Sequence, residues 1–325
     1  MMTMKYTVRR IAMLLATMVI VSFLAFAAFT IISGDPATAM LGTEATPERV
    51  AALREELGLN QPLLVRYGQW LLGFFTGDLG MSYSYRQPVW DLIAPKVRVS
   101  LWLSLVSFVL ITAVSIPLGL WSARLEGRPG LLWRVLEAVG TVFNQLCMAI
   151  PPFFIGMILS YGFGIVLKWF VPGDFPGLEQ DFAGSLRYLL FAAAAIAIPR
   201  AAMTVRMLGS VINGEMRRDY VRTAISRGND RSGVLRRHVL KNALTPVVTL
   251  LAQTMAEIVA VSIVVEQVFS IPGLGRMLVA SISNRDYPVV QAIVVILAFW
   301  VVLAGTVADI LNQTIDPRLR LGGES

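Results

Sequence analysis

The sequence predicts an all-α polytopic membrane protein with six transmembrane helices and with both termini in the cytoplasm. Hydrophobic residues make up 56% of its 325 residues and charged residues only 15%, whereas soluble chains carry about 25% charged residues. The mean hydropathy is +0.66, and the charges are gathered between long apolar runs. This composition excludes a soluble enzyme, a disordered scaffold and a secreted disulfide-linked module.

The six predicted spans are the runs that reach about 20 residues, the length that an α-helix needs to cross a bilayer. Four runs contain no charged residue. Two more are interrupted by a single charge each, Arg200 in one and Glu257 in the other. In chain order the predicted spans are 11–34, 99–123, 138–167, 188–205, 242–265 and 287–308.

The positions of lysine and arginine set the orientation, because cytoplasmic loops carry an excess of these residues. With the N-terminus inside, the inner segments hold 18 of the 28 lysines and arginines. Topology thereby explains the net charge of +7, and a nucleic-acid-binding surface is the weaker explanation. The predicted parts are an N-terminal transmembrane helix at 1–34, an extracytoplasmic helical segment at 35–98, a transmembrane core at 99–316 and a cytoplasmic tail at 317–325.

The N-terminus also has features of a cleavable signal peptide. Lys5, Arg9 and Arg10 precede the apolar run, and the Ala25-Phe26-Ala27 sequence imitates a cleavage site. The run continues to Ile32, however, which is the length of a span and exceeds a signal core. We therefore expect a retained helix, and cleavage would leave the orientation of the later spans unchanged.

The outer segment is too long for a simple connection and contains two amphipathic stretches. The first begins with Pro47 in its first turn and ends at Gly58. Its apolar face is formed by Val50, Leu53 and Leu57. The second covers 63–75 and includes Trp70, Phe74 and Phe75, which is typical of a helix at the membrane boundary. The alternative is an interface-packing hairpin without ligand contacts.

The inner segment between spans four and five combines basic residues with apolar residues at helical spacing. A short helix is predicted at about 215–228, with one apolar face formed by Met216, Tyr220, Ala224 and Ile225. Gly228 permits a tight turn, and a second helix begins near Val234 and runs into span five. The apolar face favours docking into a protein groove, and the alternative is an anchor on anionic lipid headgroups.

Around this short helix the sequence resembles the coupling loop of ABC importer permeases, in the form used by the oligopeptide, dipeptide and nickel group. The resemblance rests on 219–224, Gly228, 236–238 and 242–246, and it continues through 265–276, 285–291 and 316–318. Three outer stretches, 34–37, 55–59 and 77–80, resemble the first of the two permeases in such importers. The sequence departs from the broader importer pattern at Arg222, Thr223 and Lys241.

The resemblance implies a passive subunit of type I ABC importer architecture in the cytoplasmic (inner) membrane, without enzymatic activity or cofactor. Implied partners are a second homologous permease, two ATP-binding subunits or domains and an extracytoplasmic peptide-binding protein. The sequence has no G-x-x-x-x-G-K-[ST] motif that would cradle ATP phosphates. The implied cargo is an oligopeptide or dipeptide, with nickel or another small solute as the alternative.

Two sets of site residues follow from the resemblance. The residues implied to couple this chain to the ATPase are Asp219, Tyr220, Val221, Arg222, Thr223, Ala224 and Gly228. The residues implied to contact the binding protein are Glu266, Phe269, Pro272 and Gly273. For the second set, the alternative is a turn that only caps the helix bundle.

The two charges inside spans form a further candidate site. A charge at a helix centre costs at least about 2.5 kcal/mol by insertion scales, so it normally faces protein or water. At ~1.5 Å per residue, Arg200 lies roughly 18 Å and Glu257 roughly 12 Å below the outer end of its span. We predict that both face the translocation path, as a pair or as separate contacts for a peptide's charged ends. The alternative is that Arg200 snorkels to inner headgroups and Glu257 hydrogen-bonds within the bundle.

Other classes of protein fit the sequence less well. An ion-coupled secondary transporter favours broken helices in mirrored halves, but Pro151-Pro152 offers a single break and no second half mirrors the first. An intramembrane serine protease is excluded because the only histidine, His238, lies in a basic inner loop. One histidine also excludes paired-histidine metal sites, and the single Cys147 cannot form an internal disulfide.

Overall fold

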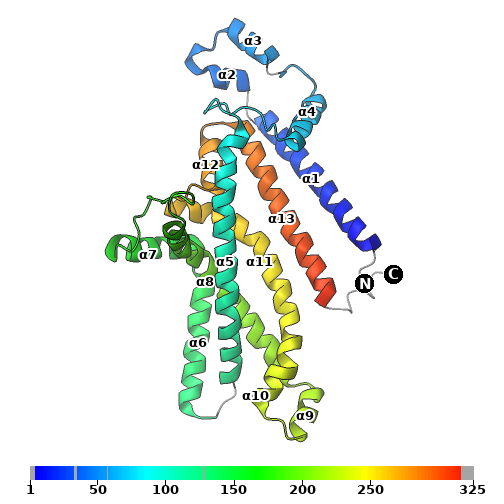
Figure 1. Ribbon diagram of the computed structural model, residues 1–325, viewed down its shortest axis with the longest axis vertical. Helices are drawn as coiled ribbons and strands as arrows, with labels where there is room; N and C mark the ends of the chain where they lie inside the picture. The colour runs from blue at the N-terminus through cyan, green and yellow to red at the C-terminus, as the bar shows by residue number, and fades with distance from the viewer. Residues whose placement is uncertain (1–3, 33–34, 57, 127–128, 316–325) are drawn as a thin grey trace. The chain divides into compact units, whose positions relative to one another are not determined.

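The structure is a computed structural model that describes residues 4–32, 35–56, 58–126 and 129–315 (Figure 1). Within these residues every regular element is a helix, and the only extended pairing is one antiparallel bridge between Met81 and Pro88. The chain divides into two compact units, one of Met1–Leu101 with Ile271–Val302 and one of Trp102–Ser270 with Leu303–Ser325. The helical content agrees with the predicted all-α class.

The first unit contains one long helix, α1 (Met4–Ile32), and several short elements. The short elements are α2 (Pro36–Leu41), the 3₁₀ turn η1 (Gly42–Glu44), α3 (Pro47–Glu56), α4 (Leu63–Thr76) and α12 (Leu274–Ser283). The first residues of α5 (Val89–Leu125) and of α13 (Tyr287–Ile315) also belong to it. Its core consists of Leu79, Val89, Ile93, Leu274, Val289, Ala292 and Ile293.

The second unit is built around α8 (Phe182–Met216). This helix packs against α6 (Leu131–Ala149), α7 (Pro152–Leu159) and α11 (Leu240–Phe269). The remaining elements are the rest of α5 and of α13, the π-helical segments η2 (Ser160–Val166) and η3 (Leu235–Val239), and the short helices α9 (Asp219–Ser226) and α10 (Arg231–Val234). Many buried residues of α8 are alanines, for example Ala192, Ala193 and Ala195, and such small side chains let neighbouring helices approach closely.

Five of the six predicted spans are confirmed, and the third is corrected. Five helical stretches of the described chain are long and apolar enough to cross a membrane. The predicted span at 138–167 corresponds to a pair of helices, Leu131–Ala149 and Pro152–Val166, bent by 100° at the break between them. The prediction of one continuous run at 138–167 is therefore wrong. Proline has no N–H and its ring clashes with the preceding turn, so Pro151 and Pro152 end one helix and begin another.

The two amphipathic helices predicted between the first two spans are present as α3 and α4. The Arg49 N–H donates to the Thr46 hydroxyl at 3.4 Å at the start of α3. Leu57, Gly34 and 316–318, on which part of the sequence interpretation rested, lie outside the described residues. The aromatic residues of α4 pack against α1, with the Tyr67 ring centroid 5.2 Å from that of Phe23.

Candidate functional site

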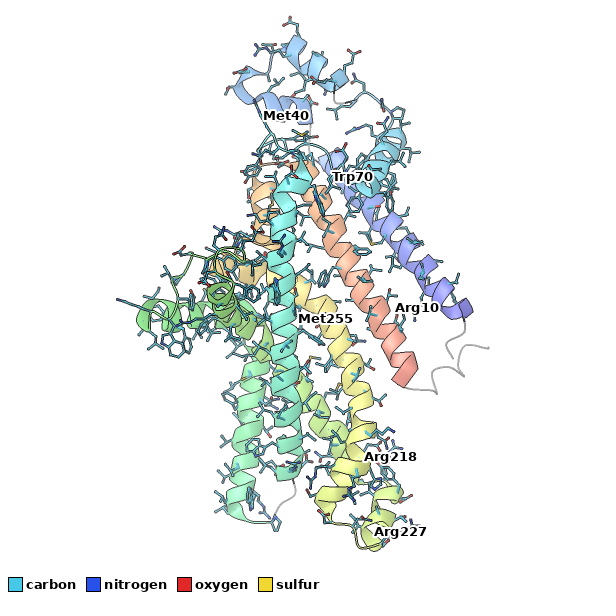
Figure 2. The ribbon with its side chains drawn as sticks, viewed as in Figure 1. Arg10, Met40, Trp70, Arg218, Arg227 and Met255 are labelled. Carbon is cyan, nitrogen blue, oxygen red and sulfur yellow. The ribbon has the colours of Figure 1, made fainter. Side chains whose placement is uncertain are left out.

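The predicted coupling helix is a separate element, α9, which Figure 1 shows as a short helix beside α10. The backbone leaves the helical conformation at Arg218, where φ is −74° and ψ is 155°, so α8 ends at Met216 and α9 begins at Asp219. Gly228 follows α9 with a φ of +87°, a value that glycine adopts readily. From α10 the chain continues through η3 into α11. The predicted turn and the second helix are confirmed, and Figure 2 labels Arg218 and Arg227 on either side of α9.

Polar contacts connect α9 to both long helices that flank it in sequence. The Tyr220 hydroxyl donates to Oε2 of Glu215 in α8 at 2.8 Å, and Nδ2 of Asn242 in α11 donates to the Tyr220 hydroxyl at 3.4 Å. Arg218 pairs with the same Glu215 carboxylate at 2.8 Å. Partial burial raises the pKa of Tyr220; the Asn242 bond opposes this and the Glu215 carboxylate adds to it. Neither Glu215 nor Asn242 was among the predicted coupling residues. Glu215 stands at the edge of the range predicted for the short helix but belongs to α8, and Asn242 belongs to α11.

The predicted coupling residues differ in exposure. Asp219 and Arg222 project into solvent, with side chains 98% and 78% exposed and their charged atoms 3.7 Å apart. Val221 is 1% exposed, so its side chain holds α9 in place and offers no surface to a partner, which corrects its assignment as a contact. The Thr223 hydroxyl donates to the carbonyl of Asp219 at 3.0 Å, so this side chain also makes a hydrogen bond within α9.

The two mid-span charges form an ion pair. NH1 of Arg200 in α8 contacts Oε2 of Glu257 in α11, so the long side chains span the difference in depth that the sequence indicated. The structure therefore contains the predicted pair, whereas its position on the translocation path stays a prediction. The two side chains remain 27% and 49% exposed, so one side of the pair is open to whatever lies beside this chain.

A cavity of 960 Å³ lies in the second unit between α5, α6 and α8. Its lining contains both apolar and polar side chains. Two polar contacts connect different parts of the lining. Asn213 donates to the Glu126 carboxylate, and Asn144 donates to the Ala202 carbonyl at 3.0 Å. The sequence did not indicate this cavity, because its polar residues are scattered along three helices. Arg200 and Glu257 are not among its lining residues.

The residues implied to contact the binding protein are mostly buried. Glu266 and Phe269 are both 0% exposed and Gly273 is buried, whereas Pro272 is partly exposed. The Tyr188 hydroxyl donates to the Phe269 carbonyl at 2.5 Å, and the Phe170 ring lies 6.1 Å from the Phe269 ring. Buried side chains offer no docking surface, so Glu266, Phe269 and Gly273 are corrected to structural residues. The alternative of a capping turn describes them better.

A buried carboxylate fixes the loop that precedes α5. Asp286 is 0% exposed, and it accepts the N–H groups of Tyr83 at 3.0 Å and of Ser84 at 3.2 Å together with the Ser82 hydroxyl. The loop closes on itself through the Met81 bridge to Pro88, and we call residues 81–88 the outer hairpin. Burial raises the pKa of Tyr83 to about 12; the charge of Arg66 opposes this shift and that of Asp286 adds to it.

No group of three or more His, Cys, Asp or Glu side chains that could hold a metal ion occurs among the described residues. The arrangement instead consists of long apolar helices, one exposed charged helix between two of them, and one ion pair at span depth.

Comparison with known proteins decides the family. The model of the binding-protein-dependent transport system inner membrane component matches residues 115–321, and the model of the N-terminal part of such components matches residues 2–106. The chain belongs to this family. The permease is accordingly a multi-pass protein of the inner membrane, and membership of the family implies partners that bind ATP and partners that bind the transported solute.

Relatives of the permease match it over nearly their whole length. A putative peptide transport system permease protein of Brucella abortus (strain 2308) is 35% identical over 312 residues, which cover 96% of this chain and 98% of the relative. A probable peptide ABC transporter permease protein of Sinorhizobium fredii is 31% identical, with 97% and 99% covered. The glutathione transport system permease protein GsiC of Salmonella paratyphi A is 33% identical, with 97% and 98% covered. The resemblance drawn from the sequence is confirmed.

Loss of the Asp286 carboxylate should loosen the outer hairpin of the permease. In the unsubstituted permease, the two carboxylate oxygens of Asp286 accept hydrogen bonds from three donors. In Asp286→Asn the side chain has only one oxygen that can accept them. A buried donor without a partner costs about 1–3 kcal/mol. We therefore expect hydrogen exchange at the Tyr83 and Ser84 amides to accelerate about tenfold or more, measured by mass spectrometry.

The matched control is Asp78→Asn. Asp78 accepts one exposed backbone N–H, that of Gly80 at 3.0 Å, and its loss should leave exchange in the hairpin unchanged. Equal exchange in the Asp286→Asn variant and the unsubstituted permease would show that the buried carboxylate does not hold the hairpin.

Proposed function

We propose that this chain is a transmembrane subunit of an ATP-driven ABC importer that translocates peptides, oligopeptides or dipeptides, across the cytoplasmic membrane by alternating access. The cargo is inferred from three relatives, two of which are named as peptide permeases and one as a glutathione permease. The observation that carries the mechanism is α9, an exposed charged helix joined by side-chain contacts to two membrane-spanning helices.

The proposed assembly contains a second homologous permease, two ATP-binding subunits or domains and an extracytoplasmic peptide-binding protein. ATP hydrolysis resides in the ATP-binding partners. Both termini and α9 lie in the cytoplasm, and residues 35–98 lie outside. This orientation is supported by the excess of lysine and arginine in the segments that it places inside.

In the proposed mechanism α9 inserts into a groove of an ATP-binding subunit and moves with it. Asp219 and Arg222 face outward and meet the partner, while Val221 is buried and holds the helix to its own chain. Tyr220 contacts Glu215 of α8 and Asn242 of α11. A displacement of α9 therefore pulls on both spans together, and these are the two spans that hold the Arg200 and Glu257 pair.

The experiment that tests this function is uptake in proteoliposomes that contain the permease, its second permease and the ATP-binding subunits. Uptake of a labelled oligopeptide should require both ATP and the binding protein, and nickel should not compete. Uptake driven by a proton gradient with this chain alone would contradict the proposal and would favour an ion-coupled transporter.

Charge reversal at Arg222 should uncouple ATP hydrolysis from uptake. Among the residues that the structure describes, Arg222 makes one ion pair, with the nearly fully exposed Asp219, so Arg222→Glu should leave the fold intact. A reversed charge in a docked interface costs several kcal/mol. We expect uptake to fall at least tenfold while the amount of permease in the membrane, measured by immunoblot, stays constant.

Arg227→Glu is the matched control, because Arg227 lies just beyond the last residue of α9. It should reduce uptake less than Arg222→Glu. Unchanged ATP-dependent uptake in Arg222→Glu would show that this face of α9 does not meet the ATP-binding partner.

A further inference from the structure

We infer that a cavity in the first unit receives an acidic side chain of the extracytoplasmic binding protein. The inference rests on the proposed function, from which it takes the binding protein and the external position of residues 35–98. Glu266, Phe269 and Gly273, the residues first expected to contact the binding protein, are buried. The cavity is a different contact site, and it is open to a partner.

The cavity has a volume of 610 Å³, within the range of about 300–1,000 Å³ that is usual for binding pockets. Its lining comes from separate parts of the unit. Arg66 and Trp70 belong to α4, Tyr83 to the outer hairpin, and Gln291 to α13. Met40 of α2 is a further lining residue, and Figure 2 labels both Met40 and Trp70.

Fixed contacts hold two walls of the cavity. Asp286 anchors the outer hairpin and with it Tyr83. Nε of Arg54 donates to Oδ1 of Asp35 at 2.9 Å, which ties α3 to the start of α2. Burial alone would raise the pKa of Asp35, but the bonds from Thr38 and Arg54 outweigh it and lower that pKa. The carboxylate therefore stays charged and the pair persists at neutral pH.

One positive charge of the lining has no acidic partner. Arg54 is neutralised by Asp35, whereas Arg66 makes no ion pair in the part of the chain that the structure describes. The Arg66 guanidinium lies 5.9 Å from the centre of the Phe26 ring, a cation–π contact that does not neutralise its charge. Arginine binds carboxylates through two parallel N–H···O bonds, so a carboxylate is the ligand that this lining fits.

The position of the cavity favours a protein as the source of the carboxylate. It is lined mainly by residues of 35–98, the segment proposed to lie outside the membrane. The chain belongs to a family of binding-protein-dependent permeases, and the proposed binding protein is extracytoplasmic, so it would approach from that side. Opposite charges across an interface chiefly raise the association rate and set the orientation, which is what delivery of a solute requires.

The test is a titration of purified binding protein into proteoliposomes containing the complete complex, with ATP hydrolysis as the readout. Arg66→Glu should raise the half-saturating concentration of binding protein at least tenfold. Arg66→Met, which removes the charge but keeps an unbranched chain against Phe26, should raise it by less. Arg49→Glu is the matched control, because Arg49 of α3 is exposed, pairs with Glu44 and does not line the cavity. It should stay within twofold of the unsubstituted permease.

Two results would overturn the inference. One is a half-saturating concentration in Arg66→Glu that is within twofold of the unsubstituted value or equal to that of Arg49→Glu. The other is an unchanged half-saturating concentration of binding protein together with a raised peptide concentration for half-maximal uptake, which would assign the carboxylate to the solute. Failure of the proposed function is distinct, since the unsubstituted complex would then show no binding-protein-dependent uptake at all.

Discussion

Replacement of Gly228 by valine is expected to abolish ATP-driven uptake while the permease remains inserted in the membrane. Gly228 has a φ of +87°, and an added Cβ would meet no atom within 4 Å. The obstacle is therefore the backbone conformation and not a lack of space. A left-handed conformation costs an L-residue roughly 1–2 kcal/mol, and a β-branched side chain is least tolerated there.

The strained turn would release this cost by moving α9 relative to α10. Since α9 is the proposed contact with the ATP-binding subunit, a shifted α9 should lower uptake at least tenfold, measured in the reconstituted complex. ATP hydrolysis in the same vesicles should lose its dependence on the binding protein. Immunoblots of the membrane fraction report whether the variant is inserted.

Gly228→Asn is the matched control for this prediction. Asparagine adopts positive φ more easily than other non-glycine residues, so it should retain most of the uptake despite a similar increase in volume. If valine and asparagine reduce uptake equally, bulk is the cause and the backbone argument fails. If neither reduces it, the turn after α9 does not matter for coupling.

The sequence was most informative where the membrane dictates structure locally. Charge-free length located the spans, and a glycine after an amphipathic stretch located the end of α9. Contacts between residues far apart in sequence were mostly hidden. Asp286 binds the hairpin some 200 residues earlier, and no local pattern marks that partnership. The Arg200 and Glu257 pair was the exception, because helix rise alone places two residues on neighbouring spans at similar depth.

Burial was the other property that the sequence could not supply. Val221 lies in a short polar stretch and Phe269 lies just before a Pro-Gly turn. Both positions look accessible in the sequence, yet other elements cover both side chains. The 100° bend of the third span was visible only as a proline pair. Proline removes a hydrogen bond and so permits a break, but the direction of the chain after the break is set by packing of α7 against α8 and α11.

Disruption of the Arg200 and Glu257 pair is expected to have the other large effect on uptake. Glu257→Gln leaves the guanidinium of Arg200 without its carboxylate at span depth, where an unpaired charge costs about 2.5–3.5 kcal/mol by insertion scales. Arg200→Gln does the same to the carboxylate. We propose that the pair faces the translocation path, so each variant should lower peptide uptake at least tenfold. Immunoblots of the membrane fraction measure how much of each variant is inserted.

The charge-swapped double variant Arg200→Glu with Glu257→Arg separates a role in translocation from a structural one. It restores opposite charges on α8 and α11, so membrane insertion and amount should recover. Uptake should stay low, because each position that meets the solute would now carry the opposite charge. Normal uptake in the double variant would reduce the pair to a structural link between two helices. Normal uptake in both single variants would show that the pair does not line the translocation path. A structure of the assembled transporter with either side chain facing lipid would show the same.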